Sequence, residues 1–144
     1  GYTSTLDFDT EISTHTHDGW EFLFVKNGEL TYTVDGSAFD IKPNCLIISR
    51  PGAVHTLRAK GTVHYERYGF VVTEHLLSKE IMEKLPAEVH VLNIAENSIM
   101  LEIFEKIGFY ISNLQRQLLE TVLTNLLGEL WVNIYLGAKN NICY

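Results

Sequence analysis

Short runs of apolar and β-branched residues recur along the first two-thirds of the chain, and this rhythm constrains the fold more than any other feature. The runs repeat about every eight to twelve residues, with turn residues between them. The strands expected from them lie at 6–12, 20–26, 29–34, 38–41, 45–48, 54–59, 63–72 and 89–94. Many short strands at even spacing are typical of a β-sandwich or a β-barrel. The sequence therefore predicts a mainly β fold over residues 1–93.

Two dipeptides in this region favour tight hairpins. Asn27-Gly28 and Asp35-Gly36 each stand between two of the expected strands. Because these residue types tolerate a positive φ, they suit the two-residue turns that join antiparallel neighbours. We therefore expect a hairpin at each of these positions.

The apolar pattern changes to a helical period after residue 93. Apolar residues recur at helical spacing over 98–111 and again over 114–136, and a weaker helix at 75–85 ends before Pro86. The apolar stripe of the last helix is too wide for one shallow contact. Either both of its parts belong to the core, or one part packs on the strands while the other contacts a second chain. The second interpretation makes residues 94–144 a helical dimerisation and linker segment, with contacts between chains at Leu119, Val122, Leu123, Leu126 and Leu130.

Charge and apolar run length exclude several classes of function. The chain has 11 Lys and Arg residues against 18 Asp and Glu residues, for a net charge of −7. An acidic surface repels phosphate backbones, so this segment is not expected to bind nucleic acid by itself. Its apolar runs are too short to cross a membrane, and the beginning of the chain lacks the pattern of a signal peptide. We expect a cytoplasmic protein with reduced cysteines and no membrane partner.

One cluster of side chains suggests a binding site. His15, His17 and Glu21 share one parity in a short stretch, so in a strand their side chains point to the same face. The opposite parity carries Trp20, Phe22 and Phe24, which suits an apolar packing face. Two imidazoles and a carboxylate are a natural ligand set for Zn²⁺, Fe²⁺, Mn²⁺ or Ni²⁺.

A fourth candidate ligand, His55, follows the turn at Pro51-Gly52, and a closed barrel would bring it next to the first three. The rest of the sequence offers little for covalent chemistry. Ser37 and Ser49 lack the Gly-x-Ser-x-Gly context of a nucleophile elbow, and Cys45 stands in an apolar run. No residue is assigned a catalytic role.

The spacing of these residues resembles two sequence motifs of the cupin family. His15-x-His17, then Glu21 and Gly28, is similar to the first cupin motif, and Gly52 to His55 is similar to the second. The chain departs from the cupin pattern at Asp9, where a glycine is usual, and at Ala59, where an asparagine is usual. The resemblance implies a double-stranded β-helix barrel, followed here by a C-terminal helical pair.

With its departures, the chain resembles the N-terminal domain of AraC-type transcription regulators. The features shared are His15-x-His17, the Trp20-Glu21 pair, and the apolar strand that leads to Pro51 and His55. The resemblance implies a barrel that holds a small effector such as a sugar, a last long helix that pairs two subunits, and a separate C-terminal domain, not in this chain, that reads DNA. The residues expected to contact the effector are His15, His17, Glu21, Tyr32, His55 and Arg58.

Two other functions remain open at this point. The first is a small metal-dependent cupin enzyme, an isomerase or a dioxygenase, with the metal on His15, His17, Glu21 and His55. The second is a dimeric binding protein that works without a DNA-binding partner. In a sensor, the same four residues either hold a divalent metal or form a polar patch that lines the effector pocket.

Overall fold

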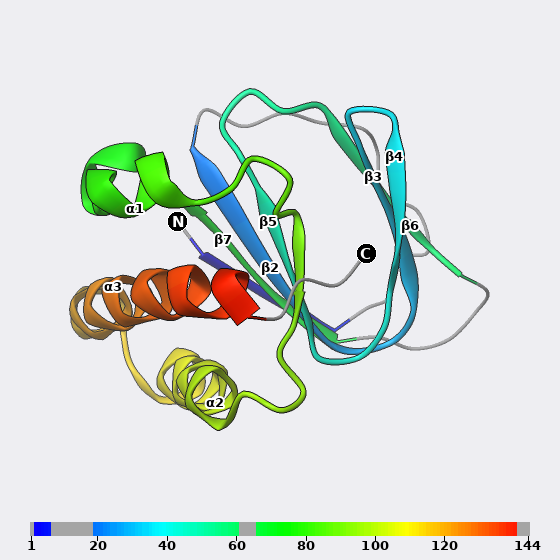
Figure 1. Cartoon of the computed structure of the whole chain (residues 1–144). Helices are drawn as coiled ribbons and strands as arrows, with labels where there is room; N and C mark the ends of the chain where they lie inside the picture. The colour runs from blue at the N-terminus through cyan, green and yellow to red at the C-terminus, as the bar shows by residue number, and fades with distance from the viewer. Residues whose placement is uncertain (1, 7–18, 61–65, 141–144) are drawn as a thin grey trace.

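A computed structural model describes residues 2–6, 19–60 and 66–140 and contains two facing β-sheets (Figure 1). The five-stranded sheet has the order β1-β7-β2-β5-β8 and the three-stranded sheet the order β4-β3-β6, and all neighbouring strands are antiparallel. The strands are β1 (Tyr2–Leu6), β2 (Trp20–Asn27), β3 (Leu30–Val34), β4 (Ser37–Ile41), β5 (Cys45–Ser49), β6 (His55–Ala59), β7 (Glu66–Val72) and β8 (Val91–Asn93). These confirm a β-rich fold, and β2 to β8 lie close to the predicted positions. β1 was not predicted, and residues 7–12 of the strand expected at 6–12 lie outside the described residues. Within the described residues no strand of one sheet pairs with a strand of the other. The structure therefore shows two facing sheets, and closure of the predicted barrel is not confirmed.

The two predicted hairpins have different outcomes. Asp35-Gly36 joins β3 to β4 as a two-residue turn, with Val34 opposite Ser37 and positive φ angles of 50° and 80°. Asn27-Gly28 was predicted to join neighbouring strands, and this is wrong, because β2 pairs with β5 and β7 whereas β3 pairs with β4 and β6. Gly28, at φ 108°, instead lies where the chain passes from one sheet to the other.

Alternation along β2 builds two separate cores. Trp20, Phe22 and Phe24 point to the helical side of the five-stranded sheet, as predicted. Leu23 and Val25 point into the space between the sheets. Because successive side chains of a strand face opposite ways, the neighbouring strand β5 also contributes to both cores, with Leu46 and Ile48 on the helical side and Cys45 and Ile47 between the sheets.

A layer of helices covers one face of the five-stranded sheet (Figure 1). It contains the 3₁₀ helix η1 (Glu74–Leu76), α1 (Lys79–Lys84), α2 (Ser98–Asn113) and α3 (Arg116–Asn140). The side chains of Ser78 and Asn97 cap α1 and α2 by accepting hydrogen bonds from backbone amides. The predicted C-terminal pair is therefore present, and α1 adds a third helix to the same layer. No helix within the described residues is long and apolar enough to span a membrane.

Most of the α3 residues predicted to join two chains lie on the inner face of the helix. Leu119, Leu123, Leu126 and Leu130 are buried in the chain's own core against the sheet and the other helices, and Val122 is half-buried. These four leucines are therefore not available to a second chain in this structure. The exposed apolar side chains of α3 are Leu118, Val132 and Leu136, which lie on the opposite face of the helix.

Candidate ligand site between the two sheets

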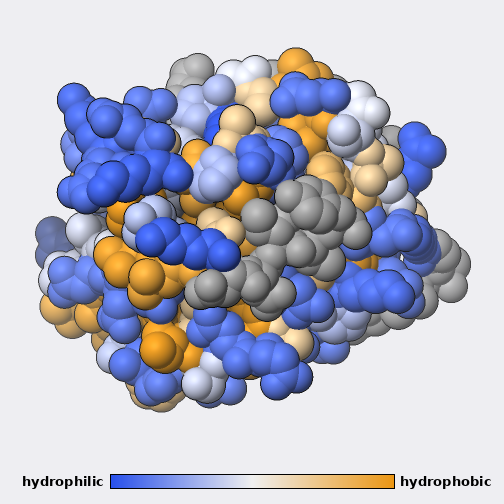
Figure 2. Space-filling view, viewed as in Figure 1, coloured by the Kyte–Doolittle hydropathy of each residue, from blue (hydrophilic) through white to orange (hydrophobic). Residues whose placement is uncertain are grey.

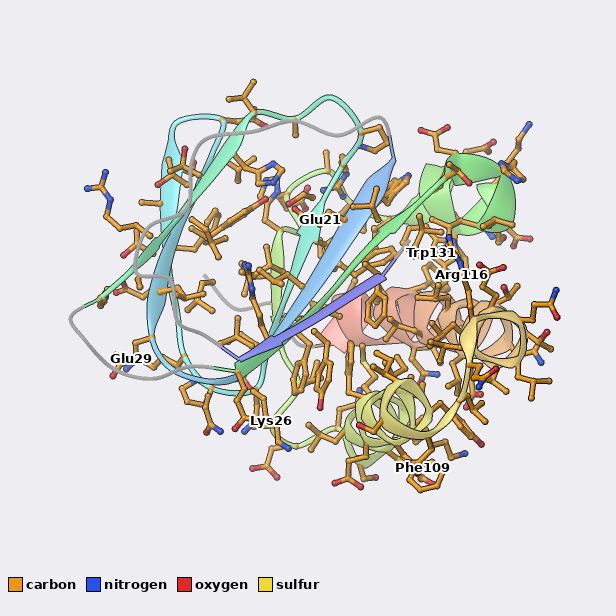
Figure 3. All side chains as sticks on the ribbon, turned by 180° about the vertical axis from the view of Figure 1, so that it is seen from behind. Glu21, Lys26, Glu29, Phe109, Arg116 and Trp131 are labelled. Carbon is orange, nitrogen blue, oxygen red and sulfur yellow. The ribbon has the colours of Figure 1, made fainter. Side chains whose placement is uncertain are left out.

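Glu21 and His55 meet across the space between the two sheets. Glu21 lies at the start of β2 and His55 at the start of β6, and Figure 3 labels Glu21 on β2. The Oε1 atom of Glu21 is 2.9 Å from the Nε2 atom of His55, and the side chains are 19% and 1% exposed. The structure thus brings together two of the predicted site residues that are 34 positions apart in the sequence.

The second ring nitrogen of His55 is also engaged. Its Nδ1 lies 3.1 Å from the carbonyl oxygen of Ala53, which can only accept a hydrogen bond, so Nδ1 carries a proton. Nε2 faces a carboxylate oxygen, which is also an acceptor when ionised. The Nε2–Oε1 contact therefore holds either a proton, carried by His55 or by Glu21, or a bound metal ion.

A buried tyrosine and a serine extend this polar group. The Tyr32 hydroxyl lies 2.6 Å from the Ser49 hydroxyl, and the Tyr32 ring is 5.8 Å from the His55 ring. Burial raises the pKa of Tyr32 to about 12, so it remains a neutral hydroxyl. Tyr32 was predicted to contact an effector and Ser49 was not, although Ser49 shares the inward parity of Cys45 and Ile47 on β5.

The remaining predicted residues do not join this group. Arg58 is exposed and follows the inward-facing Leu57 on β6, so it points away from the space between the sheets. His15 and His17 lie outside the described residues. Among the described residues, no three His, Cys, Asp or Glu side chains form a group able to hold a metal ion.

Two residues without a predicted role lie next to this space. The His90 ring is 5.6 Å from the ring of Phe39, which contributes to the core between the sheets. Arg50 donates hydrogen bonds to the carbonyl oxygens of Val89 (2.8 Å) and Pro86 (2.7 Å), and it stacks over the Trp20 ring at 5.4 Å. Arg50 therefore fixes the segment that leads into His90. No sequence motif marks Arg50 or His90 as part of a site. The residues around them come from distant parts of the sequence, so a local pattern could not have identified them.

The pKa of His55 predicts a pH-dependent stability. Burial opposes the charged ring, but the hydrogen bonds to Glu21 and Ala53 and the Glu21 carboxylate together raise the pKa above 6.5. Protonation of His55 therefore stabilises the fold below pH 6.5, and this contribution is lost as the pH rises through the raised pKa. In chemical denaturation of chelator-treated protein, we expect the difference in unfolding free energy between the wild type and His55→Gln to shrink across this window.

The wild-type profile alone would hide this effect. Burial, followed by the charge of Arg50, lowers the pKa of His90, so its contribution is lost as the pH falls and has the opposite sign. The comparison is therefore made within a His90→Gln background. If the difference between the proteins with and without His55→Gln stayed constant with pH, a charged His55 would be contradicted.

Comparisons with known proteins show what this chain is similar to. Residues 3–67 match the family model of the cupin domain. The structure is similar to that of the AraC-like transcriptional activator CuxR, with 12% identity and a TM-score of 0.61 over 85% of this chain and 43% of that chain. A search of the curated proteins gave no match. Residues 3–67 are therefore similar to a cupin domain, and the similarity of fold to CuxR extends over most of the chain.

Two other solved structures match a shorter part of the chain. One is a cupin superfamily protein from Desulfitobacterium hafniense, with 15% identity and a TM-score of 0.41 over 51% of this chain and 62% of that chain. The other is a predicted oxalate decarboxylase from Thermotoga maritima, with 20% identity and a TM-score of 0.41 over 44% of this chain and 56% of that chain. These matches, like that to CuxR, span less than two-thirds of the other chain.

Proposed function

We propose that this chain is the effector-sensing and dimerisation part of an AraC-type transcription regulator. The observation that carries the proposal is the extent of the similarity to CuxR, which covers 85% of the chain, more than the cupin match at residues 3–67. Similarity of fold does not by itself assign a function. The buried polar group between the sheets supplies a ligand site, and the outer face of α3 supplies a surface for a second subunit. DNA binding is proposed for a part of the regulator outside this acidic chain.

The effector is proposed to bind between the sheets and to contact Glu21 and His55. These two groups and the Tyr32–Ser49 pair are polar side chains beside the apolar core between the sheets, and they could hydrogen-bond a hydroxylated small molecule. His15 and His17 are proposed to complete the site. Ligand binding changes the activity of the regulator only if the ligand binds one arrangement of the two subunits better than another.

A thermal-melt screen with sugars and small metabolites tests the ligand site. We expect a cognate molecule to raise the melting temperature of the wild type, since a ligand at about 100 times its Kd adds about 2.7 kcal/mol of stability. Glu21→Gln should remove most of this shift, whereas the matched change Glu102→Gln, on the exposed surface of α2, should leave it unchanged. A ligand that stabilises the Glu21→Gln protein as much as the wild type would rule out this site.

The exposed stripe of α3 has the symmetry of a self-pairing surface. Leu118 and Leu136 are 63% and 50% exposed and lie equally far from position 127. Figure 2 shows hydrophobic side chains at the surface over α3 and α2. A two-fold axis beside position 127 would place Leu118 of one chain against Leu136 of the other in an antiparallel pair. Because a two-fold dimer uses the same patch on both subunits, a stripe with this mirror pattern supports homodimerisation through α3.

Cysteine cross-linking tests this register in a Cys143→Ser background. A mixture of Leu118→Cys and Leu136→Cys chains should form a disulfide-linked heterodimer under mild oxidation. Leu118→Cys alone should not, since its own copy would lie roughly 27 Å away along the helix. In sedimentation, Leu136→Glu should give monomers, whereas Phe109→Glu, on the outer face of α2 (Figure 3), should remain dimeric. Efficient cross-linking of Leu118→Cys to itself would contradict the antiparallel pair.

A metal-dependent enzyme is a second candidate, and the contact between Glu21 and His55 favours it. The Nδ1 hydrogen bond to Ala53 leaves Nε2 as the ligand atom, an arrangement usual for metal-binding histidines. Glu21 and His55 would supply two of the four predicted ligands, and a bound metal would supply Lewis-acid chemistry. Metal analysis of protein purified without chelators or a nickel column tests this candidate. A stoichiometric metal that is lost in Glu21→Gln, together with a monomeric chain, would favour the enzyme over the sensor.

A further inference from the structure

A groove of about 610 Å³ lies on the helical side of the molecule, between the end of β7 and the first half of α3. It is separate from the site between the sheets and shares no residue with it. Its apolar lining comes from three elements, with Phe70 and Val72 on β7, Leu76 on η1, and Leu123 and Leu127 on α3. A volume of this size is typical of sites that bind small organic molecules.

The groove is charged at one end, and the rest of its lining is apolar apart from Thr73 and Thr124. On α3 its lining residues recur at helical spacing on one face, from Arg116 and Glu120 to Leu123 and Leu127. Because a helix rises 1.5 Å per residue, this face runs along the groove for about 16 Å. Leu76 at the opposite wall is 53% exposed, so the groove leaves apolar surface in contact with water. Its shape therefore suits an elongated molecule with one polar end.

The charged end of the groove favours an anionic group. Arg116 is 88% exposed, and its one hydrogen bond within the described residues runs from Nε to Oε1 of Glu120, at 3.3 Å. The terminal guanidinium nitrogens therefore keep their donors for a ligand, and a planar fork of this kind matches a carboxylate. The first turn of α3 contains no acidic residue, and within the described part of the chain the carboxylate of Glu120, one turn further along, accepts only from Nε of Arg116.

We propose that this groove binds a monocarboxylate with an unbranched apolar chain. The carboxylate lies at Arg116, and the chain runs along α3 over Leu123 and Leu127 towards Leu76. Arg116 appears in Figure 3 at the start of α3, away from Glu21. The site is on the side of α3 opposite the stripe of Leu118 and Leu136, so its occupation is compatible with the proposed pairing of two chains. The proposal does not depend on the proposed function.

Titration of the full chain with decanoate, kept below its micellar concentration, tests the proposal. Binding is followed by calorimetry and located by amide chemical shifts in NMR spectra. We expect saturable binding with shifts at the end of β7 and along residues 116–127. Arg116→Gln should weaken binding about tenfold or more, because a hydrogen bond to a charged group is lost. Glu120→Gln is the matched control and should bind decanoate at least as well as the wild type. Arg116 and Glu120 are both exposed, so neither change threatens the fold.

A ligand with the opposite charge completes the experiment. Decylammonium has a chain of the same length, and we expect it neither to bind saturably nor to displace decanoate. Equal binding of the two amphiphiles, or an Arg116→Gln protein that binds decanoate as the wild type does, would overturn the proposal. Absence of saturable decanoate binding would overturn it as well. Shifts centred on Glu21 and His55 would also overturn it, while supporting a ligand site between the sheets.

Discussion

Replacement of Trp131 by alanine is expected to lower the free energy of unfolding by about 3–5 kcal/mol, the usual cost of removing a large buried aromatic side chain. Trp131 is 1% exposed and joins α3 to the sheet, with its ring 5.0 Å from Trp20 and 5.7 Å from Phe22. Its Nε1 also donates a hydrogen bond to the carbonyl oxygen of Ser78, at the start of α1. The alanine variant therefore loses packing between three elements at once. Urea denaturation followed by far-UV circular dichroism measures the change.

Trp131→Phe serves as the control for this prediction. Phenylalanine keeps an aromatic ring at the same place but cannot donate to Ser78, so we expect it to cost clearly less than alanine. Since Trp131 holds α3 on the sheet, both variants should also weaken the pairing of two chains in the same order. An alanine variant as stable as the wild type would mean that α3 is not held on the sheet as described.

Gly19→Ala is the second substitution with a large expected effect. A Cβ atom at Gly19 would lie 2.5 Å from the carbonyl oxygen of Val72, closer than real Cβ atoms come, and 3.0 Å from its carbonyl carbon. Both of these are backbone atoms of β7, so no flexible side chain can move aside. We expect a destabilisation of about 3 kcal/mol, at the upper end of the usual cost of overpacking. The displaced backbone also carries Trp20 and Glu21, so the site between the sheets should lose ligand affinity.

Gly128→Ala is the matched control because it makes the same chemical change in open space. A Cβ at Gly128 would meet no atom of the described residues within 4 Å, and the glycine lies inside α3. Alanine is a better helix former than glycine, so this variant should be more stable than the wild type by about 0.5–1 kcal/mol. Thermal denaturation of the two variants should therefore give shifts of opposite sign. Equal shifts would contradict the close approach of Gly19 to β7.

Residue patterns predicted the local structure well where one rule decides it. Alternation along β2 correctly assigned Trp20, Phe22 and Phe24 to the face opposite Glu21. The same rule applied to β6 from His55 onward excludes Arg58 from the site, so that prediction failed through incomplete use of the pattern. Asn27-Gly28 shows a limit of turn signals. The dipeptide fixes a local backbone conformation but does not determine which strands pair beside it.

Predictions that depend on partners distant in the sequence were less accurate. The width of the stripe on the last helix indicated two contacts, but periodicity cannot tell which half faces the chain's own sheet. The structure places Leu119 and Leu130 inward and leaves Leu118 and Leu136 outside. Ser49, Arg50 and His90 were missed as neighbours of the site because their positions depend on the pairing of β5 with β2 and β8. Of the four predicted ligands, Glu21 and His55 do meet, and the placement of His15 and His17 remains a prediction.

Native mass spectrometry of the intact chain tests the central claim, a ligand-binding dimer, most directly. The protein is purified without chelators or a nickel column and measured before and after addition of a mixture of sugars and small metabolites. We predict a species of twice the 16.4 kDa chain mass that gains one small molecule per chain, and a Leu136→Glu variant that is monomeric. A monomeric wild type that carries one metal ion per chain and gains no metabolite would contradict the sensing and dimerisation account.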